Sequence, residues 1–167
     1  PLVPSAVIFD LGVGSSKVRP SFEEGYAAAK EAKKEFLTGK VGVGTGCTVG
    51  KLLGSDFSME GGLGFSSHTF SDGTIVSALV AVNALGSIVN PENGQIIAGP
   101  KRDGKIFDSL DLLVNGKPQK RGFQNTTIGT IMTNAKISKV DCKRLAVAAN
   151  DGLAMSVRPS HTSNDGD

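Results

Sequence analysis

The chain has 167 residues, of which 39% are hydrophobic and 5% aromatic, and its formal net charge is +2. This length and apolar content fit a single domain with a core. The near balance of charges and the mixing of Lys and Arg with Glu exclude a basic stripe that would bind nucleic acid. The sequence contains no run of 18 apolar residues, so we expect no transmembrane helix.

The two cysteines, Cys47 and Cys142, could pair, but nothing in the sequence requires it, and we expect free thiols in a reducing cytoplasm. No signal peptide is recognised, so a cytoplasmic location is predicted. The chain starts at Pro1 rather than Met and stops at Asp167, and we therefore expect it to be a fragment of a longer chain.

The first 70 residues predict a strand, a helix and a second strand. Residues 5–11 are typical of a buried strand that ends in a glycine turn. Ser21 and Glu24 form a capping box, which predicts a helix through about Leu37. Residues 61–70 have the pattern of a strand built from small residues.

The middle of the chain is the most apolar. Residues 73–89 are rich in β-branched side chains and predict one buried strand. The pair Asn93-Gly94 predicts a type I′ turn in a hairpin that spans residues 89–97. Residues 99–122 are polar and predict a loop.

A strand and a helix are predicted after this loop. Residues 126–135 have the pattern of a strand. Ser138 and Asp141 resemble a capping box, and the helix that they open is expected to reach about Val157. Strands and helices alternate along the chain without repeats, which indicates a layered α/β or α+β fold.

The glycine-rich run at residues 42–50 leads into Lys51 but is not a phosphate loop. Thr45 and Leu52 stand where that motif needs Gly and a hydroxyl residue. The run therefore predicts a tight backbone turn that positions Lys51.

Metal and cofactor chemistry has little support in the sequence. The cysteines and histidines have no zinc-ligand spacing; they are Cys47, Cys142, His68 and His161. We therefore expect no metal and no organic cofactor.

Asn83 interrupts the most apolar segment. A buried amide must find hydrogen-bond partners, so Asn83 has either a structural role as a satisfied amide or a functional role as an oxyanion donor. The sequence leaves both interpretations open.

Two polar segments suggest an enzyme that cuts its own backbone. Thr126 follows Asn125 at the start of an apolar strand, and Asp165 and Asp167 lie two residues apart at the end of the chain. Cleavage before Thr126 would free an α-amine with a pKa of about 8 beside the hydroxyl, and this amine would serve as its base.

Six segments, in chain order, resemble the DmpA-type aminopeptidases and their NylC-like branch of 6-aminohexanoate oligomer hydrolases. They are residues 4–10, the glycine-rich run to Lys51, residues 81–83, 124–128, 143–146 and 161–167. The resemblance implies a self-processing N-terminal-nucleophile hydrolase with the αββα sandwich of the DmpA and ornithine acetyltransferase type, incomplete in this chain. It also implies homo-oligomers of processed subunit pairs.

The resemblance assigns roles to individual residues. Thr126 would be the nucleophile after cleavage of the Asn125-Thr126 bond, with Lys51 beside it to lower the pKa of the amine or hydroxyl and to stabilise charge. Asn83 would contribute to the oxyanion hole. The carboxylates that orient the nucleophile and its amine would be Asp165 and Asp167.

Phe9 departs from the family pattern, because the family often has Tyr in this strand. The change removes a hydroxyl donor that would contact the oxyanion or the substrate. By the same resemblance, residues 1–125 would be the C-terminal part of the large subunit and residues 126–167 the N-terminal part of the small subunit.

The implied substrates are small peptides, amino-acid amides or esters, and linear amide oligomers. Two other functions remain open. One is acyl transfer of the ornithine acetyltransferase type, and the other is a catalytically inactive homologue that is never processed.

Overall fold

A three-stranded antiparallel sheet of order β3-β4-β9 forms the centre of the structure, a computed structural model that describes residues 5–116 and 125–165. Its strands are β3 (Gly62–Thr69), β4 (Ile75–Asn83) and β9 (Thr126–Thr133). The register of β4 and β9 runs from Val76 opposite Thr133 to Asn83 opposite Thr126. The strands predicted at 61–70 and 126–135 are confirmed.

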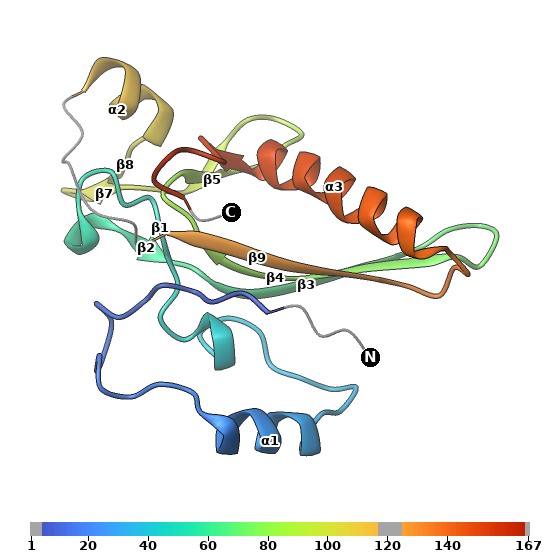
Figure 1. Cartoon of the computed structure of the whole chain (residues 1–167). Helices are drawn as coiled ribbons and strands as arrows, with labels where there is room; N and C mark the ends of the chain where they lie inside the picture. The colour runs from blue at the N-terminus through green and yellow to red at the C-terminus, as the bar shows by residue number, and fades with distance from the viewer. Residues whose placement is uncertain (1–4, 117–124, 166–167) are drawn as a thin grey trace.

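One face of this sheet is covered by α3 (Lys139–Ser156), which lies along the strands (Figure 1). Ser138 begins the helix as predicted, because its Oγ accepts a hydrogen bond of 3.2 Å from the Asp141 N–H. An apolar groove of about 930 Å³ lies between helix and sheet, and its lining includes Val80, Ile131 and Leu145.

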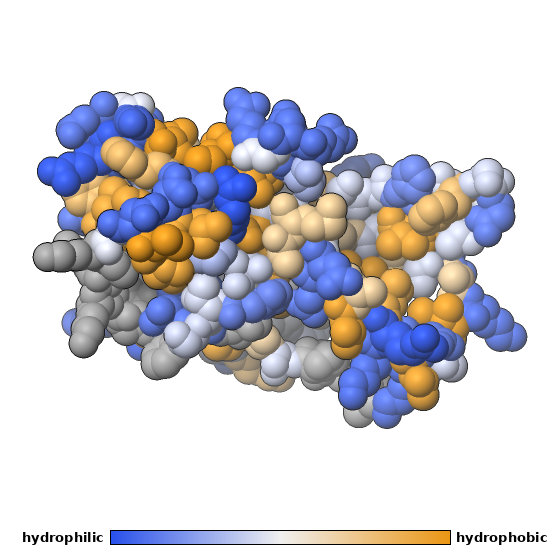
Figure 2. All heavy atoms as spheres, turned by 90° about the horizontal axis from the view of Figure 1, so that it is seen from above, coloured by the Kyte–Doolittle hydropathy of each residue, from blue (hydrophilic) through white to orange (hydrophobic). Residues whose placement is uncertain are grey.

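Apolar side chains also reach the surface on the side of the molecule that carries α3 (Figure 2). On α3 these are Val140, Val147 and Met155, which are between 61% and 68% exposed. The helix therefore has apolar side chains both toward the sheet and away from it.

The N-terminal segment differs most from the predictions. The buried strand predicted at residues 5–11 is absent, because none of the described strands pairs with this segment. The segment is also not buried, since Val7 is 80% exposed. The capping box does open a helix, α1 (Phe22–Lys30), but this helix ends well before Leu37. Phe36 instead packs edge-on against Phe65 of β3, with ring centroids 5.2 Å apart, so the chain leaves the helix to reach the sheet.

The apolar stretch at 73–89 is not one strand, as predicted, but two strands in different sheets. β4 ends at Asn83, and the chain turns at Gly86 into β5 (Ser87–Val89). A Cβ on Gly86 would lie 2.2 Å from the Pro159 carbonyl oxygen, so this sharp connection requires glycine. The second sheet has the order β10-β5-β6, with β6 (Ile96–Ala98) and β10 (Val157–Arg158).

The predicted hairpin exists as β5 and β6, but its turn is not type I′. That turn needs positive φ at both central residues; Gly94 has a φ of 71°, whereas Asn93 does not have positive φ. A two-residue turn with both φ values positive joins β7 (Lys101–Arg102) to β8 (Lys105–Ile106) instead. Its central residues are Asp103 and Gly104, at 51° and 77°.

The region predicted as a loop is thus partly regular. After β8, the Asp108 carboxylate accepts a hydrogen bond of 2.9 Å from the Leu110 N–H and caps α2 (Ser109–Asn115). The rest of the predicted loop, residues 117–122, lies outside the described residues.

Short elements complete the end of the molecule where β4 ends and β9 begins. They are the 3-10 turns η1 (Gly42–Gly44) and η2 (Ser55–Phe57) and the paired strands β1 (Thr48–Val49) and β2 (Met59–Glu60). Val49, Ala84 and Val157 form the buried core there.

Helices combined with small antiparallel sheets make the structure α+β, in agreement with the predicted class. The αββα sandwich remains a prediction. In the described parts of the chain, no helix has the length and apolarity needed to cross a membrane.

Candidate active site

Thr126 is the first residue of β9 and lies opposite Asn83, the last residue of β4. The antiparallel register therefore brings together two residues that are far apart in the sequence. The Thr126 hydroxyl is half-buried and donates a hydrogen bond of 2.5 Å to the carbonyl oxygen of Asn125. This contact places the hydroxyl beside the peptide bond at which cleavage is predicted.

The Asn125 side chain is buried and joins the last loop of the described chain. Its Nδ2 donates a hydrogen bond of 2.8 Å to the carbonyl oxygen of Asn164. Its Oδ1 is buried and has no hydrogen-bond partner among the described residues. An unsatisfied buried oxygen is costly, so the residue before the predicted cleavage point carries a local energetic penalty.

Lys51 and Asn83 contact each other directly. The Lys51 Nζ donates hydrogen bonds of 2.6 Å to Asn83 Oδ1 and 2.9 Å to the Asn83 carbonyl oxygen. The Thr48 N–H also donates to Asn83 Oδ1, at 3.0 Å. Since two donors hold Oδ1, the amide orientation of Asn83 is determined by its surroundings.

The backbone around Lys51 is held by the connection from β4 to β5. The Gly50 and Lys51 N–H groups donate hydrogen bonds of 3.0 Å to the carbonyl oxygens of Gly86 and Leu85. The glycine-rich run therefore does position Lys51, as predicted, and its end is held against the residues that connect β4 to β5.

Asn83 is fully buried, and its amide nitrogen also has a partner. Its Nδ2 donates a hydrogen bond of 3.2 Å to the carbonyl oxygen of Phe9. The structural interpretation of Asn83 as a satisfied buried amide is therefore met, while the oxyanion role stays a prediction.

Burial lowers the pKa of Lys51 from 10.5 to about 8. The charges of Cys47, Asp165 and Asp10 oppose this change and favour the ammonium form. Cys47 is itself fully buried, and burial followed by the charge of Asp10 raises the pKa of its thiol. The site thus holds one largely buried amine with a pKa of about 8 and one buried thiol that resists ionisation.

Asp165 reaches this region from the loop that follows β10. Its Oδ1 accepts a hydrogen bond of 3.1 Å from the Leu85 N–H, and its Oδ2 accepts one of 2.7 Å from the Thr162 hydroxyl. The Asp165 carboxylate thus ties this loop to the end of β4 and acts on Lys51 through its charge. Asp167, the other predicted carboxylate, lies outside the described residues.

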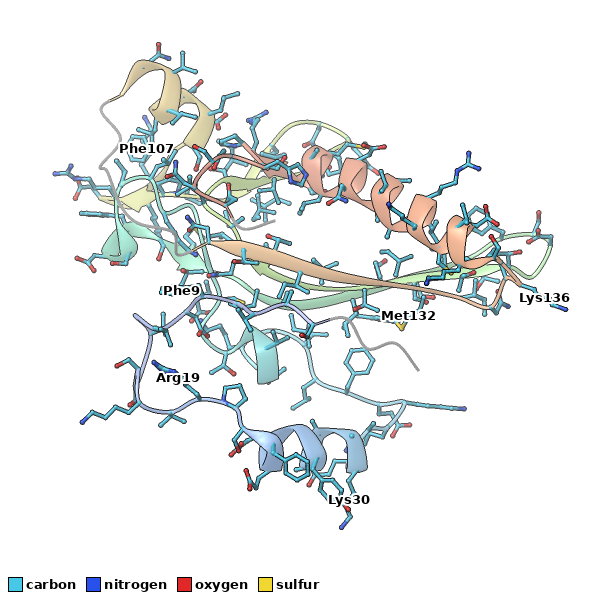
Figure 3. The ribbon with its side chains drawn as sticks, in the orientation of Figure 1. Phe9, Arg19, Lys30, Phe107, Met132 and Lys136 are labelled. Atoms are coloured by element: carbon cyan, nitrogen blue, oxygen red, sulfur yellow. The ribbon has the colours of Figure 1, made fainter. Side chains whose placement is uncertain are left out.

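Phe9 meets the site through its backbone. The aromatic side chain is 41% exposed, while the carbonyl oxygen accepts the hydrogen bond from Asn83. Figure 3 shows Phe9 in the N-terminal segment below the end of the sheet at which β9 begins, far from Met132.

Asp10 and Cys47 were not predicted as part of the site. Both influence the pKa of Lys51, and Cys47 lies in the turn that leads to it. The available signal was the position of Cys47 four residues before Lys51 within the glycine-rich run. The proximity of Asp10 depends on a chain path without regular secondary structure, which no local pattern predicts.

Within residues 5–116 and 125–165, no three His, Cys, Asp or Glu side chains are grouped so that they could hold a metal ion. The arrangement combines a hydroxyl beside a peptide carbonyl, a buried amine and a buried amide. In chemical terms, the hydroxyl can be a nucleophile, the amine a nearby cation and the amide a hydrogen-bond donor.

Comparisons with known proteins give a consistent result. The sequence model of peptidase family S58 matches residues 1–167. An uncharacterized aminopeptidase of Mycobacterium leprae is 40% identical over 180 residues, which cover the whole chain and 48% of that relative. An uncharacterized aminopeptidase of Mycobacterium bovis is 38% identical over the whole chain and 49% of its own length.

A 6-aminohexanoate-oligomer endohydrolase of Paenarthrobacter ureafaciens is also similar. It is 31% identical over 173 residues, which cover 99% of this chain and 48% of that enzyme. The chain therefore spans about half the length of the relatives that it matches.

Proposed function

The chain belongs to peptidase family S58, the DmpA family, and from this premise we propose that it carries the nucleophile of a self-processing amide hydrolase. Thr126 is the proposed nucleophile, and the proposed cleavage separates Asn125 from Thr126. The substrates would be small peptides or other linear amides.

The observation that carries this proposal is the position of the Thr126 hydroxyl. It lies 2.5 Å from the Asn125 carbonyl oxygen. Thr126 begins β9 opposite Asn83, and Asn83 accepts hydrogen bonds from Lys51. The hydrogen bond holds the hydroxyl beside the peptide group whose carbonyl carbon it would attack, and holding reacting groups together removes much of the entropic barrier.

In the processing step, Thr126 Oγ1 attacks the carbonyl carbon of Asn125. The bond between that carbon and the Thr126 nitrogen breaks, the nitrogen takes up a proton, and an ester to Oγ1 forms. Water then hydrolyses the ester, which leaves an Asn125 carboxylate and a free Thr126 α-amine. The freed amine has an ordinary pKa of about 8 and becomes the base for the hydroxyl.

In the mature enzyme, the same hydroxyl would attack the carbonyl of an external amide. An acyl-enzyme forms, the amine product leaves with a proton from the Thr126 α-amine, and water releases the acid. The order of events is that of processing, with the substrate carbonyl in place of the Asn125 carbonyl.

The surrounding residues have proposed roles in both reactions. Lys51 stabilises the negative charge that develops near Asn83, and Asn83 contributes to the oxyanion hole. Asp165 keeps Lys51 charged and holds the last loop against β4, and Asp167 joins it in orienting the nucleophile and its amine. The hydrogen bonds of Lys51 and Asp165 support these assignments.

The substrate class rests on the relatives. Two of them are named aminopeptidases and one is named a 6-aminohexanoate-oligomer endohydrolase. We propose that the whole protein hydrolyses amide bonds in short linear molecules and assembles as a homo-oligomer of processed subunit pairs.

The proposal is tested by the intact mass of the full-length protein beside a Thr126→Ala variant. We expect two fragments in the parent protein, the second of which starts at Thr126, and one uncut chain in the variant. Thr127→Ala is the matched control, because Thr127 has the same side chain on the opposite face of β9, and it should still be processed. A single chain in all three samples would remove the N-terminal-nucleophile mechanism.

A further inference from the structure

Asp10 belongs to the surroundings of Lys51, although it lies in a segment without regular secondary structure. The roles proposed above use Thr126, Lys51, Asn83 and the two carboxylates at the end of the chain. Asp10 adds a carboxylate that comes from the opposite end of the described chain and is half-buried.

The Asp10 carboxylate lies directly against Gly46. A Cβ built on Gly46 would be 2.1 Å from Asp10 Oδ2 and 2.6 Å from the Asp10 Cβ. Gly46 is buried and does not have positive φ, so its lack of a side chain matters because it leaves room for Asp10. The turn that leads to Lys51 is therefore shaped to accept this carboxylate.

The residue before Asp10 is anchored to the site as well. The Phe9 carbonyl oxygen accepts the hydrogen bond from Asn83 Nδ2, and the Asp10 carbonyl oxygen accepts one of 2.8 Å from the Val13 N–H. These contacts hold an otherwise irregular segment on both sides of the Asp10 side chain.

The charge of Asp10 acts on two groups of the cluster. It favours the ammonium form of Lys51 and raises the pKa of the Cys47 thiol. The other groups that act on Lys51 are Cys47 and Asp165. Lys51 and Lys40 act on Cys47, and the Lys40 Nζ donates a hydrogen bond of 3.0 Å to the Cys47 carbonyl oxygen. Asp10 and Asp165 thus place negative charge near Lys51 from two separate segments.

We propose that Asp10 is a positioning residue of the Thr126 site: it places a negative charge against the turn that carries Lys51 and, through the anchored Phe9 carbonyl, keeps the Asn83 amide oriented. This inference rests on the proposed function of the site. It adds a residue whose action is indirect, since Asp10 works through Lys51 and Asn83.

The first experiment measures Lys51 directly and does not depend on activity. Lysine side chains are labelled with ¹³C in full-length Thr126→Ala protein, and the Lys51 signal is assigned from a Lys51→Met sample. Asp10→Asn, which keeps the shape that fits against Gly46, should lower the pKa of Lys51 by about half a pH unit to one pH unit. Asp151→Asn, an exposed carboxylate on α3, is the control and should leave it unchanged.

The second experiment follows the processing rate of the parent protein and of Asp10→Asn against pH. If charged Lys51 is needed, the alkaline limb of the profile moves to lower pH in the variant. The rate should fall about two- to fivefold at pH 8 and change little at pH 6, since Lys51 is charged in both proteins there. A merely structural role would lower the rate equally at both pH values.

Gly46→Ala provides a second route to the same result. The added methyl group displaces the Asp10 carboxylate, so this variant should reproduce the pH-dependent loss, and adding it to Asp10→Asn should cause little further change. Additive losses would mean that Gly46 and Asp10 act independently.

The outcomes separate the two proposals. An unchanged Lys51 pKa in Asp10→Asn, or an equal loss of processing at pH 6 and pH 8, would overturn the role of Asp10. An uncut parent protein would overturn the proposed function instead, and the Lys51 measurement would still report whether Asp10 acts on that amine.

Discussion

Asn83 shows how one buried polar side chain organises its surroundings. Its Oδ1 accepts hydrogen bonds from Lys51 and from the Thr48 N–H, and its Nδ2 donates to the Phe9 carbonyl. The partners come from two other parts of the chain, residues 48–51 and the segment with Phe9, and Asn83 itself ends the central strand. The hydrogen bonds that a buried amide needs therefore also join three segments at one point.

Lys51 predicts a specific dependence of stability on pH. Its pKa is about 8 in the folded protein against 10.5 for an ordinary lysine, so between these values the unfolded chain binds more protons. The contribution of Lys51 to the free energy of unfolding therefore rises with pH through this window and is lowest below pH 8.

We expect the stability of the parent protein, relative to Lys51→Met, to rise by about 2 kcal/mol between pH 7.5 and pH 10. Urea unfolding at both pH values measures it. Cys47 has a raised pKa and acts in the opposite direction above pH 9, but it is present in both proteins. Lys101→Met, at an exposed position, should show no such change, and a constant difference for Lys51→Met would contradict the buried amine.

At the scale of elements, the connections position the site. Gly50 joins β1 to Lys51 with a φ of 70°, and a Cβ there would lie 2.3 to 2.5 Å from backbone atoms of Gly99 and Pro100. The turn thus needs glycine for its backbone conformation and for the close approach of another segment.

Gly50→Ala should therefore cost about 3 kcal/mol of stability, the sum of left-handed backbone strain and steric overlap. Gly104→Ala is the matched control, since Gly104 has a similar φ of 77° but open space around it, and it should cost about 1 kcal/mol. Urea unfolding of both variants measures the difference, and equal costs would show that the close approach has no energetic weight.

Helix starts were predicted correctly from local signals, whereas the N-terminal strand, which depends on a distant partner, was not. Ser21 and Ser138 begin helices because an N-cap is a contact within one turn of the chain. The strand expected at residues 5–11 is absent because a strand needs a neighbour, and sequence pattern does not supply one. The Asp103-Gly104 turn had a recognisable local pattern that was missed.

For the whole molecule, the proposed cleavage point lies where the chain is held on both sides. Eight residue pairs join β4 to β9, and β10 pairs with β5. The Arg158 guanidinium also forms an ion pair of 2.6 Å with Asp108, and the two residues lie on opposite sides of the cleavage point.

These contacts predict that the two fragments stay together after processing. Native mass spectrometry of the processed full-length protein should show one assembly that contains both fragments, and denaturing conditions should release them. The uncut Thr126→Ala protein provides the reference mass for a single chain. Fragments that separate under native conditions would contradict the role of the β4–β9 pairing.

The sequence by itself determined the family, the starts of the two capped helices, the strands at 61–70 and 126–135, and the candidate site residues. These rest on local periodicity, capping and motif order, which can be recognised along a linear chain. Only the tertiary structure decided that Asn83 lies opposite Thr126, that Lys51 binds Asn83, and that Asp10 lies against Gly46. Strand register, burial and close packing depend on contacts between distant segments, and they set the charge and orientation of the groups at Thr126.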